Sequence, residues 1–361
     1  MRKTFLTAAL FFFAVCSHAG ELGESLDFNG KGSYMSKALS ASAGPGLIHE
    51  TGQSAAPEKS YDTVVLNGIL PDKGVTAQVQ TAPDKWEAVH LEAYDGGRFW
   101  GKYSFAEPRR EKVSLRFYSS AAASTGTLKI YDVETFLSTE PAEEEPPSAQ
   151  SRALALSAPP SIPGITLITR AQWNANAPTK AYDSQTPVMI TMHHTAGHFA
   201  LTKEEGLKEI KFTQDFHQKT KGWIDIAYHF LIDGAGNVYQ GRPVNAMGAH
   251  VKGKNADNAG ISLMGNFMDS SPTDAQLAAL KKTIQGVAKV YNVKTSRFYA
   301  HREIGQSDCP GNILYAKFQN MRKELQRGPD SELASLFASP RNRTLESLDT
   351  LQSIQSGVTV W

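Results

Sequence analysis

The sequence predicts an α/β domain, in which helices flank a mixed central sheet, preceded by a small all-β domain of the sandwich type. Three observations support this fold class. Short alternating runs separated by turn-forming residues occupy residues 61–137, as in antiparallel sheets. A linker rich in Pro and Glu follows at 138–163, where proline and like charges keep a chain extended. Strands then alternate with amphipathic helices over residues 164–327, a pattern typical of α/β domains.

The all-β prediction rests on period-two alternation between turn-formers such as Pro71–Gly74. The expected strands are Thr63–Leu66, Val75–Val79, Val89–Tyr94, Phe99–Phe105, Lys112–Tyr118 and Thr127–Val133. The preceding residues 20–60 are rich in Gly, Ser and Ala without periodicity, so we expect a loosely ordered lead-in. Trp86, Trp100 and Tyr103 could stack on sugar rings or fill the core of this domain, and we favour the core.

Capping signals and apolar stripes locate the helices of the second domain. Thr202, with Glu205 three residues later, has the form of a capping box and predicts a helix start. Ser271 followed by Pro272 predicts a second start, and a last helix is predicted over Ile313–Leu325. The expected strands are Val188–Met192, Ala227–Ile232, Val238–Tyr239, Ala259–Gly265 and Arg297–Ala300. Residues 328–361 form a tail to which we assign no function.

The first nineteen residues have the order of a secretory signal peptide. Arg2 and Lys3 precede an apolar run from Phe5 to Val15, and Ser17-His18-Ala19 supplies a small-residue cleavage site. A lipoprotein signal at Cys16 is an alternative that we do not favour, because Val15 fits poorly before a lipidated cysteine. No second long apolar stretch follows. We therefore expect a secreted or periplasmic protein without a transmembrane span.

Composition excludes some partners and draws attention to one thiol. The net charge of +1 over 361 residues gives no global attraction to nucleic acid, so we expect no nucleic-acid partner. We expect the protein to be a monomer. Only Cys16 and Cys309 occur, and cleavage after Ala19 would remove the first. An unpaired cysteine is unusual in an exported protein. Such a thiol can be buried and inert, can bridge to another chain, or can be held by a metal.

Two histidines stand where expected strands end. His193 follows Val188–Met192 and His301 follows Arg297–Ala300, and functional residues of α/β sheets tend to lie at such positions. Cys309 comes eight residues after His301, so a loop could return the thiol to the imidazole. Two His and one Cys match the three-ligand set of catalytic zinc, which leaves a fourth position open. From these residues alone, inert buried side chains remain the alternative.

Four ordered segments within residues 165–325 carry a family resemblance. They are Ile190-Thr191-Met192-His193-His194-Thr195, Gly222-Trp223-Ile224-Asp225-Ile226-Ala227-Tyr228-His229-Phe230-Leu231-Ile232, Gly248-Ala249-His250 with Gly260–Phe267, and Ala300-His301-Arg302 with Cys309-Pro310-Gly311. Together they resemble the zinc-dependent N-acetylmuramoyl-L-alanine amidases, a family that includes phage lysozyme of the T7 type and the peptidoglycan recognition proteins.

The resemblance implies one zinc ion per chain, held by His193, His301 and Cys309. It makes Tyr228 a catalytic residue that hydrogen-bonds near the metal. Ser307 falls where catalytic relatives carry Lys or Thr, so it departs in identity while keeping the hydroxyl that Thr would supply. The implied reaction is hydrolysis of the amide between N-acetylmuramic acid and L-alanine of peptidoglycan. A related branch uses a Glu where this chain has Ser262, so we assign no carboxylate base.

His194, Trp223 and His250 are expected to contact the substrate, a glycan strand with its stem peptide. Packing roles remain open for Trp223 and His250. Tyr228 could also be a half-buried strand residue, and Ser307 could only cap a turn. The rival function is a non-catalytic peptidoglycan-binding protein, and a second rival is hydrolysis of a different amide. We favour the amidase because binding-only members usually lose the cysteine that Cys309 represents.

Overall fold

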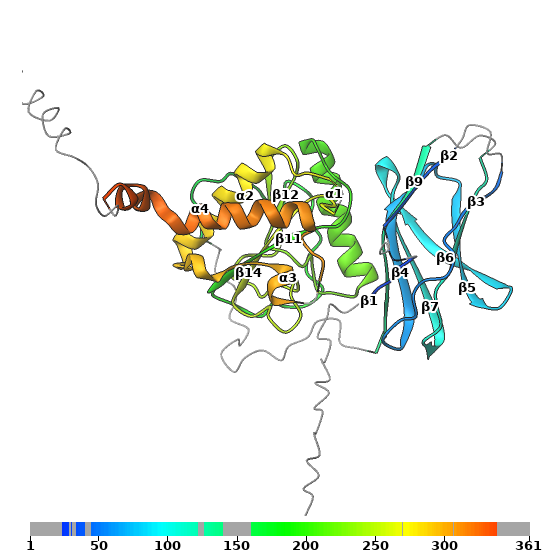
Figure 1. Cartoon of the computed structure of the whole chain (residues 1–361). Coiled ribbons are helices and arrows are strands. Elements are labelled where there is room, and N and C mark those ends of the chain that lie inside the picture. The colour runs from blue at the N-terminus through cyan, green and yellow to red at the C-terminus, as the bar shows by residue number, and fades with distance from the viewer. Residues whose placement is uncertain are drawn as a thin grey trace, which may run out of the picture. The chain divides into compact units, whose positions relative to one another are not determined.

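A computed structural model describes residues 24–28, 30, 34–39, 45–121, 126–139, 160–268, 270–305 and 307–337 (Figure 1). They divide into two compact units, one up to Phe318 and one from Gln319 onwards. The predicted signal peptide with Cys16, most of the linker and the end of the tail lie outside these ranges. Among the helices that the structure describes, none is long and apolar enough to cross a membrane.

The N-terminal domain is all-β, and its nine described strands form one sheet. The strands are β1 (Glu24–Ser25), β2 (Met35–Leu39), β3 (Gly46–Glu50), β4 (Tyr61–Ile69), β5 (Val75–Ala82), β6 (Lys85–Ala93), β7 (Arg98–Arg109), β8 (Leu115–Ser119) and β9 (Gly126–Phe136), with a 3-10 turn, η1, at Asp95–Gly97. Their order is β1-β9-β4-β7-β6-β5-β8-β3, and β2 also pairs with β9.

Strand β6 connects two halves of this sheet. Its first part, up to Val89, pairs with β5, and its second part, from His90, pairs with β7. Side chains of both halves share one core, including Val64 and Ile130 from one half and Val79 and Phe117 from the other. In strands such as β5 and β8, alternate residues point into this core, which is why the alternating pattern is visible in the sequence.

The lead-in at 20–60 differs from its sequence expectation. All six expected strands are present, and three more come from this Gly- and Ser-rich segment: β1 and β2 pair with β9, and β3 pairs with β8. Leu26, Phe28 and Ile48 are buried in the common core. These apolar residues are too widely spaced to give a local period, and only pairing with distant strands orders them.

The second domain is an α/β domain with a mixed sheet, which confirms the predicted fold class. Its elements are β10 (Leu167–Ile168), β11 (Met189–His194), α1 (Lys203–Asp215), a π-helical turn η2 (Phe216–Thr220), β12 (Phe230–Ile232), β13 (Val238–Gln240), β14 (Asn258–Leu263), α2 (Asp274–Tyr291), a 3-10 turn η3 (Thr295–Arg297), β15 (Phe298–Ala300), α3 (His301–Ile304) and α4 (Asn312–Phe337). The strand order is β10-β13-β12-β14-β11-β15. Neighbouring strands run parallel except β12 and β13.

Helix starts follow the capping chemistry with one correction. Thr202 caps α1, and its side chain accepts from Glu205 N. For α2 the sequence suggested Ser271 as the cap, but Thr273 occupies that position, and its hydroxyl accepts from Gln276 N. The same hydroxyl donates to Gly234 O at 2.6 Å, a contact across 39 residues that local sequence does not reveal. Leu280, Ile284 and Val287 form the buried apolar face of α2.

A buried ion pair links residues of the two domains within the unit that ends at Phe318. Arg98 donates from Nε and Nη2 to the Glu209 carboxylate at 2.8 and 2.9 Å, and its guanidinium lies 3.8 Å from the Phe212 ring centroid. Trp100 is buried with Phe212 and Phe216 in an adjoining apolar cluster. Of the three aromatic residues expected in the all-β core, only Tyr103 packs against it, partly buried. Trp100 packs instead with Phe212 and Phe216 of the second domain, and Trp86 is half-buried.

Candidate metal centre

His193 belongs to β11, an interior strand of the α/β sheet next to the edge strand β15. Strand β11 is paired with β15 up to Met192 and with β14 through His194, so pairing with β14 holds the backbone of His193. The sequence placed His193 and His194 just after a strand, whereas they are its last two residues. Ser262 of β14 is the register partner of His193, and no carboxylate occupies that neighbouring position.

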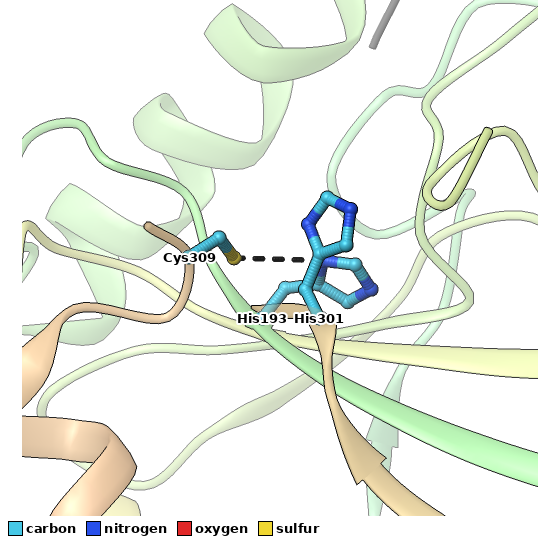
Figure 2. A group of neighbouring side chains, drawn as sticks. All are labelled: His193, His301 and Cys309. Carbon is cyan, nitrogen blue, oxygen red and sulfur yellow. Dashed lines mark hydrogen bonds between the residues drawn. The ribbon is translucent and has the colours of Figure 1, made fainter. Parts of the chain in front are cut away.

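His301 and Cys309 approach His193 from the chain that follows β15. His301 is the first residue of α3, directly after that strand, and its ring centroid lies 4.6 Å from that of His193. Cys309 Sγ lies 3.6 Å from His193 Nδ1. One ligand atom from each residue falls within 4.8 Å of the others, and all three side chains are buried. Figure 2 shows the three side chains converging from separate parts of the chain.

Hydrogen bonds of the backbone hold the loop that carries Cys309. Arg302 N donates to Cys309 O at 3.0 Å, which closes the loop after α3. The His194 N–H donates to the Cys309 sulfur at 3.3 Å. Ser307 Oγ accepts from Cys309 N at 3.1 Å, so this hydroxyl caps the turn while its own O–H can still donate.

His193 and His301 are neutral imidazoles at physiological pH and can each donate an electron pair to a metal ion. Burial, with the nearby rings of His301 and His250, holds the pKa of His193 well below its usual value. Burial lowers the pKa of His301 to about 4. A neutral imidazole keeps a lone pair on one ring nitrogen, which is the form that binds metal ions. With the Cys309 thiol, this makes a compact nitrogen and sulfur donor set.

Tyr228 stands beside this donor set. It precedes β12, so it is outside the strand that the sequence predicted from Ala227, and its ring centroid lies 5.2 Å from that of His193. Arg242 N donates to Tyr228 O at 2.9 Å. The Arg242 side chain, only 1% exposed, donates to the carbonyls of Ile226 and Met247 at 2.7 and 2.8 Å.

The predicted substrate contacts lie in three different environments. His194 is buried, and its Nδ1 accepts from Phe267 N at 3.3 Å. Trp223 is half-buried with its ring on that of His217, at 4.7 Å between centroids. His250 is buried against His193, with His250 Nδ1 and His193 Nε2 at 3.0 Å. The burial of the Arg242 side chain and its bonds to backbone carbonyls favour a role in holding a loop.

Comparison with known proteins places these residues in a family. The family model described as N-acetylmuramoyl-L-alanine amidase matches residues 183–312. Peptidoglycan-recognition protein SC2 of Drosophila simulans is 34% identical over 157 residues, which are 43% of this chain and 85% of the relative. Peptidoglycan-recognition protein LB of Drosophila melanogaster is 32% identical, over 43% and 68% respectively. The chain belongs to the amidase and peptidoglycan-recognition protein family.

A solved structure of Drosophila peptidoglycan-recognition protein SD is also similar, with 31% identity and a TM-score of 0.42. It covers 43% of this chain and 94% of that one. The residues 183–312 that the family model matches lie in the α/β domain and include the whole His193, His301 and Cys309 group. The family resemblance found in the sequence is thereby confirmed.

Buried histidines make the stability of this amidase-family domain dependent on pH. His229 Nδ1 accepts from Gly260 N at 2.8 Å, and burial lowers the pKa of His229 to about 4. An unfolded histidine has a pKa of about 6.5, so between these values the unfolded chain binds a proton that the folded one does not. Stability is therefore lost as the pH falls from about 6.5 towards about 4.

For His229 alone, this linkage predicts a loss of about 2 kcal/mol in the free energy of unfolding between pH 7 and pH 5. Denaturant unfolding of metal-free protein at both values measures it. His229→Asn keeps an acceptor for Gly260 N and should show a difference between the two pH values that is smaller by that amount. An equal pH difference in both proteins would contradict the assignment.

Proposed function

We propose that the protein is an exported, zinc-dependent hydrolase that cleaves the amide bond between N-acetylmuramic acid and L-alanine of peptidoglycan. The observation that carries this proposal is the convergence of His193, His301 and Cys309, whose ligand atoms lie within 4.8 Å of one another. The proposed signal peptide is consistent with a substrate that lies outside the cytoplasm.

The chemistry of these donors fits zinc. Two neutral imidazoles and a thiol are borderline and soft ligands, which favour Zn²⁺ over the oxygen-seeking Mg²⁺ and Ca²⁺. Structural zinc sites have four protein ligands, whereas catalytic sites use three and leave one position for water or substrate. Among the described residues, three side chains bring ligand atoms together here, which is the number of protein ligands in catalytic zinc sites.

A zinc ion here would polarise the scissile carbonyl and make water a competent nucleophile near neutral pH. Tyr228, beside His193, would donate its phenolic O–H and orient the reacting groups. Ser307 would donate its O–H to the oxyanion that develops on the carbonyl, while its oxygen accepts from Cys309 N. Such a donor contributes about 3 kcal/mol when it is well placed.

Peptidoglycan is the proposed substrate because of the relatives. Several are named peptidoglycan-recognition proteins, and one solved relative is described in complex with a monomeric diaminopimelic acid-type peptidoglycan. His194 and Trp223 remain proposed contacts for glycan and peptide, whereas His250, the third residue expected to touch substrate, is buried with both ring nitrogens bonded within the protein. The half-buried ring of Trp223 is the most open of the three to a ligand.

A non-catalytic peptidoglycan-binding protein is the second candidate, since recognition alone would use the same domain. The feature that favours the enzyme is Cys309. A protein that only binds the wall has no need of a third metal ligand, yet the loop after α3 brings this thiol to 3.6 Å from His193.

Purified peptidoglycan incubated with zinc-loaded protein tests the proposal. The amidase should release new L-alanine amino termini with time, and removal of the metal by a chelator should stop the release. Binding to the wall without any release of amino termini would reject the enzyme and leave the recognition protein. Release of a different amine would retain the hydrolase and reject its substrate bond.

Tyr228→Phe removes only the phenolic hydroxyl. We expect kcat to fall about 100-fold with zinc content unchanged, because the contact is made to the reacting groups and not to the metal. Tyr182→Phe is the matched control, since its hydroxyl bonds Asp225 and is not one of the proposed catalytic groups. Zinc analysis and initial rates on soluble peptidoglycan fragments measure both variants. Full activity in Tyr228→Phe would remove it from the mechanism.

A further inference from the structure

His250 lies in the loop before β14 and is buried beside His193 of the proposed metal site. Its side chain is buried, and its ring stands almost perpendicular to that of His193, with centroids 4.9 Å apart. Both ring nitrogens have partners: Nδ1 meets His193 Nε2 at 3.0 Å, and Nε2 meets Asn258 O at 3.1 Å. This ring joins a predicted zinc ligand to the backbone of the neighbouring strand.

The positions of the protons follow from these two contacts. A carbonyl oxygen only accepts, so His250 Nε2 must carry a proton and donate it to Asn258 O. The ring is buried and its two nitrogens meet a carbonyl oxygen and another imidazole, and a buried charge without an ionic partner is costly, so the ring is neutral and has a single N–H. His250 Nδ1 must then accept, and the proton between the rings belongs to His193 Nε2. The lone pair of His193 is consequently on Nδ1, the nitrogen that faces Cys309 Sγ.

The surrounding chain is built to hold the His250 ring in place. A Cβ atom on Gly248 would lie 2.5 Å from the ring, and one on Gly260 would lie 2.7 Å from it. Both distances are shorter than a side-chain contact permits, so glycine at both positions leaves the space that the ring fills. Asn255 Oδ1 accepts from His250 N and Val251 N at 2.7 and 2.8 Å, which fixes the backbone of the loop.

We propose that His250 is a positioning residue: by accepting the Nε2 proton of His193, it fixes the tautomer and rotation that present His193 Nδ1 to the metal. This inference rests on the zinc site of the proposed function. Partners of this kind orient metal-binding histidines, and their removal costs roughly 10- to 100-fold in metal affinity. Without the acceptor, His193 would divide between two tautomers and could turn within its pocket.

Two amide variants separate this bond from the rest of the His250 contacts. Asn places an amide oxygen close to the position of Nδ1, so His250→Asn retains an acceptor for His193 and loses the contact to Asn258. Gln reaches the position of Nε2, so His250→Gln retains the contact to Asn258 and loses the acceptor. Zinc dissociation constants are measured by competition with a chromophoric chelator. We expect His250→Gln to weaken zinc binding roughly 10- to 100-fold and His250→Asn to stay within about threefold of wild type.

A second measurement needs no metal and no variant. The ¹⁵N shifts of the imidazoles in metal-free wild type should show His193 protonated at Nε2 and unprotonated at Nδ1. The opposite tautomer would overturn the proposal, even if neither variant folds. So would equal zinc affinity in His250→Gln and wild type, or an equal loss in both variants. Wild type that binds no zinc would instead reject the proposed function, while the tautomer of His193 would still be measurable.

Discussion

Replacing Cys309 with Ala should remove the zinc ion and abolish hydrolysis together. Wild type is expected to carry about one equivalent of zinc, because two imidazoles and one thiolate form a three-ligand site. With Cys309 gone, His193 and His301 alone are left among the described donors within reach. Two-histidine sites bind zinc weakly, so we expect less than about a tenth of an equivalent after dialysis.

The loss of rate should exceed that of Tyr228→Phe. Polarisation of the carbonyl and activation of water both depend on the metal and are worth several kcal/mol, so kcat/KM should fall at least about 1000-fold. Metal analysis by mass spectrometry and the amino-terminus release assay measure the two effects on the same samples. Cys309→Ser should lose nearly as much zinc and activity as Cys309→Ala, because a neutral hydroxyl is a poor zinc ligand.

Ser307→Ala is the matched control for this experiment. Ser307 lies two residues before Cys309, and the substitution removes its bond to Cys309 N. Ser307 supplies no ligand atom to the donor set. The variant should therefore keep its zinc while losing rate to a smaller extent. Full zinc occupancy in Cys309→Ala would refute the ligand assignment, whatever the effect on rate.

Arg242→Met should destabilise the α/β domain by about 3 kcal/mol, because backbone carbonyls lose their donors in the interior. Arg242 is 1% exposed, and its guanidinium donates to Ile226 O, Met247 O and Asp225 O. Methionine preserves the apolar stem but offers no N–H. The carbonyls would then stay buried without these partners, and each such group costs about 1–3 kcal/mol.

The same substitution should also affect the site. Ile226 lies two residues before Tyr228 and Met247 lies directly before Gly248, so the guanidinium joins the segments that carry Tyr228 and His250. We expect a lower kcat with partial retention of zinc, since Arg242 supplies none of the ligand atoms of the donor set.

Arg297→Met makes the identical chemical change on the surface of the same domain. Arg297 is exposed, so this control should change the free energy of unfolding by less than about 0.5 kcal/mol. Urea unfolding monitored by tryptophan fluorescence compares the two variants with wild type. If both variants are equally stable, the internal hydrogen bonds of Arg242 contribute nothing measurable.

From the sequence alone, the three predicted zinc ligands could be identified more completely than the residues that contact them. The spacing of His193, His301 and Cys309, with the family motifs around them, predicted a group that the structure does bring together. The reason is that each of these residues is tied to the end of a strand or to a short loop after one. Such local placements survive in the linear pattern, as do the six strands predicted in the all-β domain from their alternation.

Contacts between distant segments were decided only by the tertiary structure. His193 and His250 are 57 residues apart, and their bond exists because β11 and β14 are neighbours in the sheet. Likewise, the strands β1, β2 and β3 have no local signal and are ordered by pairing with β8 and β9. Local propensity and period are carried by adjacent residues, whereas sheet order is a property of the whole packed chain. The sequence therefore determined the predicted zinc ligands, and the fold determined which neighbours hold them in position.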